Sequence, residues 1–292
     1  MAYNITALPV FQTEGKAFVI KSILEAQTIS MLTNFDATAK GIQSVQLLDS
    51  DITITDGSAC GRNPSGGAVL SQALLTVKPL KINQDYCERV LEKTWAKGEL
   101  SAGQNYDSMA FLKEISEINS AKASLEIEKM IWLGDTTLTG STSLKQIDGF
   151  IKQIKAGSYI NLSGATGATT VAKLQAIDAA MPIEVSQADD FYILMGQDTY
   201  KKYVAEMAAL NLYASASDGV LWGTTSKIKS VNGLNGGHVV ATRLRNLVAG
   251  GEMTDVDFKS YFDYPTETLM LDTRFSLGVV PVYTQEIGYV KY

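Results

Sequence analysis

Short runs of alternating apolar and polar side chains dominate residues 45–95. The runs are residues 45–48, 52–54 and 75–82. Alternation of this kind predicts strands, and the turn-rich loop over residues 56–67 separates them as in a long hairpin. Pro79 has no backbone N–H to donate, so its strand is expected at a sheet edge or a bulge. An exposed hairpin edge is a liability for a monomer but useful where a neighbouring chain covers it.

A helical period replaces the alternation over residues 106–133. The apolar positions three, four or seven residues apart are Phe111, Ile115, Ile118, Leu125 and Trp132, with Leu112 and Ala121 widening the stripe. About 25 residues rising 1.5 Å each give a rod of roughly 38 Å, longer than a compact domain of this size usually needs. Gly134 is expected to end the helix in the left-handed conformation that glycine adopts readily.

The pattern on either side of this rod is less regular. Residues 17–33 predict a short helix without a clear core face, which suits an arm that packs outside its own fold. After the rod, the sequence predicts an α/β region and then a β-rich return. Its expected elements are a capped loop over 164–170, a helix over 171–180, a buried strand over 190–195, a helix after Gly196, and strands over 227–231, 238–241 and 268–283 with a break at Pro281.

The composition is that of a globular protein. Hydrophobic residues make up 46% of the 292 residues and charged residues 19%. The formal net charge of −6 argues against tight binding of nucleic acid, which depends on Lys and Arg. Cys60 and Cys87 are expected to be free thiols of a cytosolic chain, since the first residues lack a secretory leader pattern and no apolar run reaches a membrane span.

Two stretches invite a chemical interpretation. Asp135 and Asp148 flank a Thr-, Gly- and Ser-rich loop and are candidates for paired carboxylates in a metal-dependent enzyme. The chain has one histidine, His238, and no nucleophile motif, so Asp148-Gly149 is more simply a turn. Residues 164–170 are glycine-rich and precede a helix, but they lack the lysine of a phosphate-binding loop.

Three short motifs and their order indicate a family. The first is CGRNPSGG at 60–67, followed by residues 75–82 and Cys87; the second is IWLGD at 131–135 with DGF at 148–150; the third is DFYILM at 190–195 with DTY at 198–200. Together they resemble the major capsid protein of tailed bacteriophages, with the Hong Kong 97-type fold. In detail they are similar to the hairpin, the spine-to-axial-domain junction and the axial-domain strand and helix of capsid proteins from crAss-like and other Bacteroidota phages.

The resemblance implies an α+β fold. Its expected parts are an N-terminal arm over 1–44, an E-loop hairpin over 45–85, a peripheral (P) domain over 86–150 with its spine helix over 106–133, an axial (A) domain over 151–240, and a β-rich return to the P-domain over 241–292. It implies no catalytic residue, metal or cofactor. The residues then expected at hinges and interfaces are Gly134, Asp135, Asp148, Gly149, Cys60, Gly61, Pro64, Gly66 and Pro79.

The implied function is an icosahedral shell of hexamers and pentamers that encloses double-stranded DNA. Assembly would take place in the bacterial host cytoplasm, with separate scaffold and portal proteins, possible decoration proteins, only nonspecific proximity to DNA, and no membrane. No Lys–Asn–Glu trio for covalent cross-linking is identified, so noncovalent stabilisation is expected. An encapsulin-like compartment shell and the two-aspartate enzyme are the alternatives.

Overall fold

The computed structural model describes residues 23, 26–50, 54, 67–87, 108–140, 142–210, 219–252, 256–263, 265–266 and 268–292. The strands are β1 (Asn34–Asp36), β2 (Ile42–Ser50), β3 (Ala68–Thr76), β4 (Lys78–Cys87), β5 (Ile160–Asn161), β6 (Phe191–Met195), β7 (Lys227–Ser230), β8 (His238–Arg243), β9 (Leu247–Gly250), β10 (Asp257–Asp263), β11 (Thr268–Pro281) and β12 (Gly288–Lys291). The α-helices are α2 (Gln27–Met31), α5 (Ser108–Leu133), α6 (Phe150–Ala156), α7 (Thr170–Ala180), α8 (Ile183–Ser186) and α9 (Gln197–Ala209). Short 3-10 turns are η2 (Ser143–Lys145), η3 (Asn232–Leu234), η4 (Leu244–Asn246) and η5 (Thr284–Glu286).

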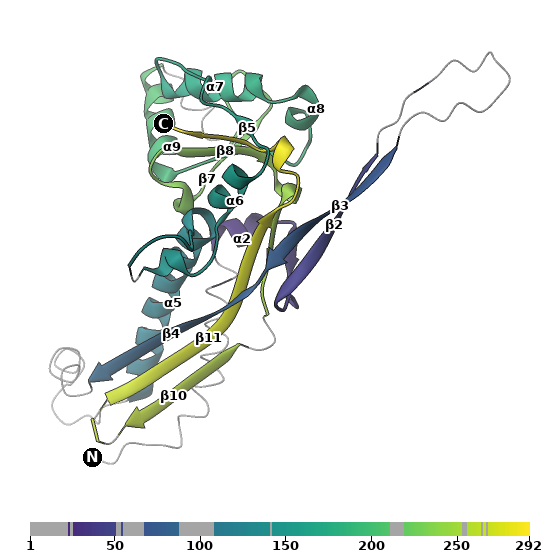
Figure 1. Ribbon diagram of the computed structural model, residues 1–292. Coiled ribbons are helices and arrows are strands. Elements are labelled where there is room, and N and C mark those ends of the chain that lie inside the picture. Colours follow the sequence, from purple (N-terminus) through teal and green to yellow (C-terminus); the bar gives the residue numbers. More distant parts are fainter. Residues whose placement is uncertain are drawn as a thin grey trace.

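The long strand β11 organises the first sheet (Figure 1). β10 and β4 flank its first half, both antiparallel to it, and its last residues pair with β9, which pairs in turn with β1. β11 ends at Pro281, as predicted, because proline cannot donate to a continuing ladder. Pro79 lies opposite Ser276 in β4, which pairs only with β11 among the described strands. The expected edge position of Pro79 is therefore confirmed.

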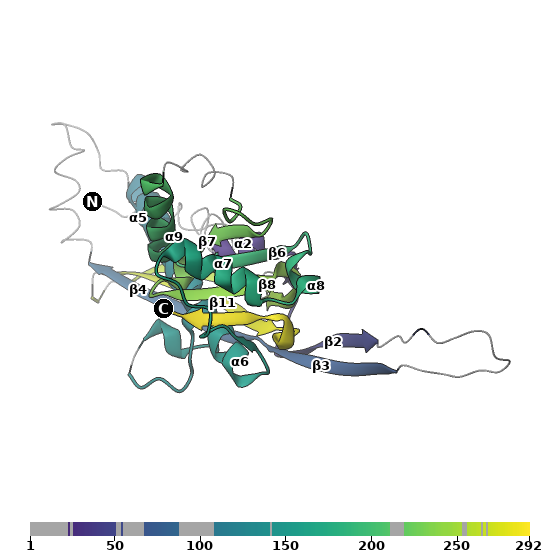
Figure 2. The same cartoon turned by 90° about the horizontal axis from the view of Figure 1, so that it is seen from above.

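A second sheet, ordered β5-β12-β8-β6-β7, carries helices on both faces. Figure 1 shows α7 on one side of it and α6 on the other, and Figure 2 shows α9 beside α7. Alternate side chains of β6 explain this arrangement: Ile193 belongs to the core under α7 and α9, while Leu194 belongs to the core that includes α6. The predicted boundary at 240/241 falls inside β8, and β12, which belongs to the predicted return over 241–292, pairs with β8 in this sheet.

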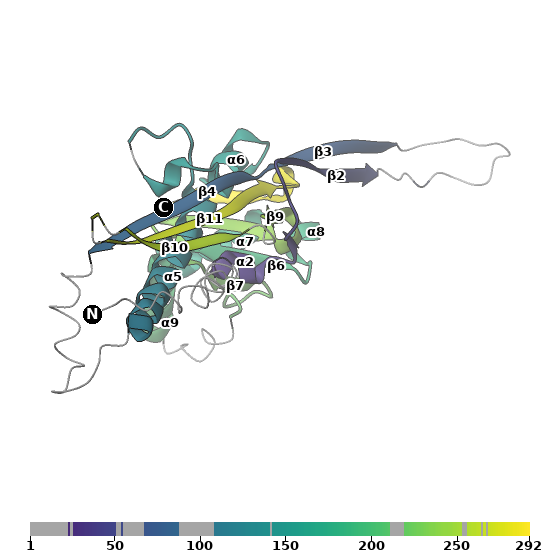
Figure 3. The same ribbon diagram turned by 90° about the horizontal axis from the view of Figure 1, so that it is seen from below.

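β2 and β3 pair over their full length as a two-stranded hairpin that extends away from the body (Figures 1 and 3). The continuous strand predicted over 75–82 is interrupted at Val77, which is buried and ends the pairing with β2. Residues after Val77 pair with β11 instead. The hairpin is therefore shorter than the predicted range 45–85, because the chain changes sheets where Val77 enters a small core. Ile54, predicted in a strand, lies outside one and is 95% exposed.

The spine helix α5 ends at Leu133, as predicted, but its buried face differs from the predicted stripe. Trp132 is fully buried, whereas Leu125 and Ile118, one and two heptads earlier, are about half exposed. The buried side chains nearby are Ile127, Glu128, Met130 and Ile131. Burial at the C-terminal end arises because α2, η3 and α6 surround it, while no described element covers the same face further up the helix.

The arm segment also departs from its prediction. The described helix is only Gln27–Met31, and Ile23, Ala26 and Ile29 are buried in the core that contains the end of α5. Residues 34–36 then pair with β9. This part of the arm therefore packs on its own subunit, because its small apolar set fits against the spine helix.

Candidate assembly surfaces and functional site

The loop between α5 and α6 is closed by two glycines. The Gly149 N–H donates to the Gly134 carbonyl at 2.8 Å, and a Cβ on Gly149 would lie 2.7 Å from the Gly134 nitrogen. A Cβ on Gly134 would lie 2.4 Å from the Met130 carbonyl oxygen. Gly134 has no positive φ, so the predicted left-handed helix end is wrong. Glycine is required here because two backbone segments touch.

The predicted aspartates do come together, around a lysine. Lys152 Nζ lies 2.7 Å from Asp135 Oδ1 and 2.6 Å from Asp148 Oδ1. Hydrogen bonds from Lys152 and Thr137 lower the pKa of Asp135 from 3.8 to about 2. Burial alone would raise the pKa of Asp148, but Lys152 and the N–H and hydroxyl of Thr136 lower it overall. Both carboxylates are thus held ionised as structural acceptors.

This arrangement does not support the two-aspartate enzyme. An acid or base needs a pKa near neutrality, and here both aspartate pKa values move away from it. Among the described residues, no three His, Cys, Asp or Glu side chains are grouped to hold a metal ion. His238, the single histidine, accepts or donates a 2.8 Å hydrogen bond with the Tyr289 hydroxyl, and burial lowers its pKa. These groups stabilise the fold.

The glycine-rich loop before α7 is capped internally. Thr169 accepts a hydrogen bond from the Ala172 N–H, as expected of an N-cap. The Glu206 carboxylate of α9 accepts the N–H groups of Thr170 and Val171 at 2.8 and 2.9 Å. The helix N-terminus that would attract a phosphate is therefore occupied by a carboxylate of the same chain.

The β2–β3 hairpin has an apolar face that its own subunit leaves uncovered. Register pairs Ser44 with Leu74 and Leu48 with Leu70, so these leucines share one face with Ile42. All four apolar side chains are 59–69% exposed: Ile42, Leu48, Leu70 and Leu74. The opposite face is covered near its base, where Leu75 is buried against Ala39 and Val248. A two-stranded ribbon cannot bury its own apolar face.

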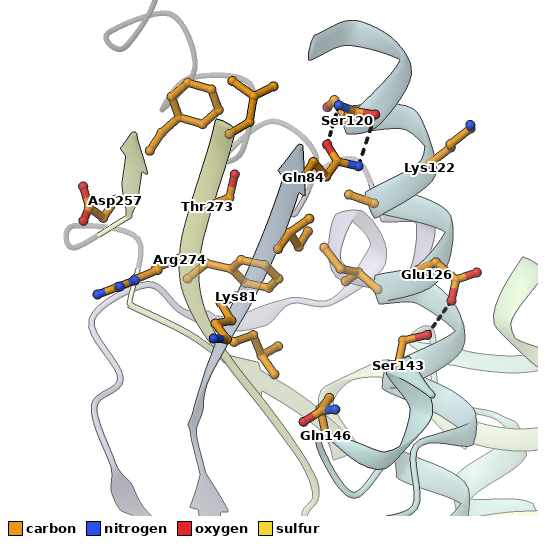
Figure 4. Close-up of a pocket in the computed structure, with 18 of the residues that line it drawn as sticks. Lys81, Gln84, Ser120, Lys122, Glu126, Ser143, Gln146, Asp257, Thr273 and Arg274 are labelled. Atoms are coloured by element: carbon orange, nitrogen blue, oxygen red, sulfur yellow. Dashed lines mark hydrogen bonds between the residues drawn. The ribbon is translucent and has the colours of Figure 1, made fainter. Parts of the chain in front are cut away.

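A cavity of about 1000 Å³ runs between α5 and the sheet of β4, β10 and β11 (Figure 4). Its apolar wall includes Ile127 and Phe275, and its polar lining includes Lys81, Lys122 and Arg274. In Figure 4 the Glu126 carboxylate accepts the Ser143 hydroxyl at the helix side.

The cysteines and the other residues predicted at interfaces differ in whether the structure describes them. Cys60, Gly61, Pro64 and Gly66 lie outside the described residues. Cys87 is an exposed free thiol at the end of β4.

The sequence interpretation missed Lys152 and Glu206. Lys152 lies four residues after Asp148 on a helix, a spacing that favours an ion pair and was available as a signal. Glu206 meets Thr170 across 36 residues, which no local pattern indicates.

Comparisons with known proteins rest on structure. No family model matches the sequence, and no curated protein sequence is significantly similar to it. A chain of the satellite phage P4 procapsid, solved with its size determination (Sid) protein, is similar with a TM-score of 0.60 and 12% identity, covering 94% of this chain and 98% of that one. A cyanophage A-1(L) capsid chain is similar with a TM-score of 0.60 and 11% identity, covering 92% of this chain and 93% of that one. A chain of the virus-like particle from Pyrococcus furiosus is similar with a TM-score of 0.57 and 11% identity, covering 96% of this chain and 99% of that one.

The chain therefore has the Hong Kong 97-type capsid fold over nearly its full length, as its sequence predicts. At 10–12% identity these likenesses concern the fold, and function has to be argued from this chain's own surfaces. None of the helices in the described part of the chain is both long and apolar enough to cross a membrane.

Proposed function

We propose that this chain is the major capsid protein of a tailed bacteriophage and assembles as hexamers and pentamers into an icosahedral shell around double-stranded DNA. The observation that carries the proposal is the uncovered apolar face of the β2–β3 hairpin, with Ile42, Leu48, Leu70 and Leu74 each more than half exposed. Burial on a neighbouring copy would remove this apolar surface from water, which is the main driving force of association.

The fold supports this proposal, because similar chains come from a procapsid and from capsids. The finer resemblance of the sequence motifs to crAss-like and other Bacteroidota phages is part of the same proposal. The proposal also includes assembly in the host cytoplasm, separate scaffold and portal proteins, decoration proteins, and noncovalent stabilisation of the shell. With a net charge of −6, the shell would lie near DNA without binding a particular sequence.

The hinge role of Gly134, Asp135, Asp148 and Gly149 is also kept as a proposal in a modified form. The closed Gly134–Gly149 contact and the Lys152 ion pairs favour a loop that moves as one piece with α6. Differences between hexamer and pentamer subunits would then be absorbed on either side of this loop.

The test is assembly of the purified full-length chain, followed by electron microscopy and sedimentation velocity. Closed shells are expected from the wild type. The double variant L70D/L74D should keep a wild-type thermal unfolding midpoint as subunits but form no shells, because buried unpaired carboxylates are strongly disfavoured. Ser71→Asp is the matched control and should still form shells, since it adds a carboxylate at an exposed position on the opposite face of the hairpin.

Two outcomes would contradict the proposal. One is a wild-type chain that stays monomeric at all concentrations and also when it is co-expressed with the separate scaffold protein that the proposal includes. The other is normal shells from L70D/L74D. Closed shells that recruit a folded protein cargo and are not filled with DNA in infected cells would favour the encapsulin-like alternative, which shares this fold.

A further inference from the structure

A buried glutamate lies where the arm meets the spine helix. Glu128 of α5 is 2% exposed and faces α2, the helix at the described end of the arm. Its Oε2 accepts the Thr28 N–H at 3.1 Å, and its Oε1 accepts the Thr28 hydroxyl. The indole N–H of Trp132, one turn along α5, donates to the same hydroxyl oxygen at 2.6 Å. The arm thus supplies two hydrogen-bond donors to this carboxylate, and the Trp132 indole of α5 is a further donor beside it.

The same arm segment also binds the loop that leads into the second sheet. Gln27 Oε1 accepts the Asn232 N–H of η3 at 3.1 Å. η3 packs directly on α5, where a Cβ on Gly233 would lie 2.5 Å from the Glu128 carbonyl oxygen. Arm, spine helix and η3 therefore meet within one buried cluster, so release of α2 would loosen all three elements.

Among the described residues, no ion pair is formed by Glu128, and the lysines of α6 are engaged elsewhere: Lys152 pairs with Asp135 and Asp148, and Lys155 lies over the Tyr289 ring. α2 (QTISM) and η3 (NGL) contain no ionisable side chain. On α5 itself the nearest cation, Lys129, is half exposed and pairs with Glu126 at 2.7 Å. Burial therefore raises the pKa of Glu128, while the hydrogen bonds from Thr28 and Trp132 oppose that rise only in part.

We propose that Glu128 and Thr28 form a latch that holds the arm segment 26–31 on the spine helix, and that loss of the Glu128 proton weakens it. The proposal rests on the proposed function, because an arm released in an assembling shell becomes available to neighbouring subunits. Ile23, Ala26 and Ile29 supply the apolar part of docking, and the buried carboxylate limits its strength.

The direction of the pH effect follows from the raised pKa. The undocked segment exposes Glu128 to water, where its pKa is ordinary. Docking is therefore most favourable below that ordinary value and weakens as the pH rises through the docked-state pKa of Glu128.

Hydrogen exchange measured by mass spectrometry on assembled full-length protein tests the latch. After correction for intrinsic exchange, protection of the peptide containing residues 26–32 should be highest below the ordinary glutamate pKa of 4.5 and should fall as the pH is raised to 8. Glu128→Gln should abolish this pH dependence. Thr28→Val should make it steeper, because the buried carboxylate then loses its hydroxyl donor. Glu126→Gln, an exposed glutamate on the same helix, is the matched control and should behave as the wild type.

Protection that is independent of pH in the wild type, or pH dependence that survives Glu128→Gln, would overturn the latch. If Glu128→Gln fails to fold, the Thr28→Val and Glu126→Gln pair decides alone. Failure of the proposed function would look different: the pH dependence would appear in isolated subunits while electron microscopy finds no shells. Shells with a pH-independent arm would reject the latch and leave the proposed function standing.

Discussion

The backbone N–H of Gly149 donates to the carbonyl oxygen of Gly134 at 2.8 Å, and neither residue has space for a Cβ. These two glycines, fifteen positions apart, join the end of the spine helix to the start of α6. The Thr-, Gly- and Ser-rich residues between them form a closed loop rather than an extended linker. Four predictions follow from this contact and from the other interactions described above.

Gly149→Ala should destabilise the subunit by about 2–3 kcal/mol, because its Cβ would overlap backbone atoms of Gly134 and Ile131. Thermal and urea unfolding of unassembled subunits measure the change. Gly164→Ala is the matched control, since nothing lies within 4 Å of its Cβ position and its φ is not positive. Equal stability of Gly149→Ala and Gly164→Ala would contradict the close approach.

Lys152→Met should reduce stability at neutral pH and flatten its dependence on acid. The folded-state pKa of Asp135 is lowered to about 2, so its contribution is present above the ordinary value of 3.8 and is lost as the pH falls toward 2. Unfolding midpoints between pH 2 and pH 7 measure this. Lys201→Met, at an exposed lysine of α9, should keep the wild-type profile. An unchanged profile in Lys152→Met would mean that the ion pairs contribute nothing.

Glu206→Ala should cost about 1–2 kcal/mol, since it leaves the N–H groups of Thr170 and Val171 without their carboxylate. Burial alone would raise the pKa of Glu206, but these hydrogen bonds and Lys173 lower it overall. Its contribution is therefore lost as the pH falls below the ordinary glutamate value. Glu206→Gln keeps one acceptor and should cost less than Glu206→Ala. Chemical unfolding at pH 7 and pH 4 distinguishes them.

Ile127→Ala should destabilise the subunit by about 2–4 kcal/mol, because Ile127 is 3% exposed in the core beneath α5. Leu125→Ala, two residues away and 50% exposed, should change the unfolding free energy by less than about 0.5 kcal/mol. Urea unfolding of subunits compares the two. A larger loss of stability from Leu125→Ala than from Ile127→Ala would mean that the buried face of α5 is the one predicted from the sequence.

Local chemistry let the sequence determine many elements. The helical period and a following glycine predict the end of α5 at Leu133, and Pro281 predicts the end of β11. The threonine pair 169–170 predicts a capped start of α7, where Thr169 is the cap, and the run 190–195 predicts the buried strand β6. Each of these features depends on residues within a few positions of one another. The order of the elements, together with the three motifs that resemble tailed-phage capsid proteins, predicted the Hong Kong 97-type fold.

Tertiary structure decided which surfaces are covered. Ile118, Leu125 and Trp132 share one helix face, yet only Trp132 is buried, because α2 and η3 reach that end alone. Thr28 meets Glu128 across 100 residues of sequence. Such contacts arise when distant segments are brought together by burial of apolar surface, and periodicity does not specify the partner. The sequence by itself determined the elements and their order, and packing determined which residues they bring into contact.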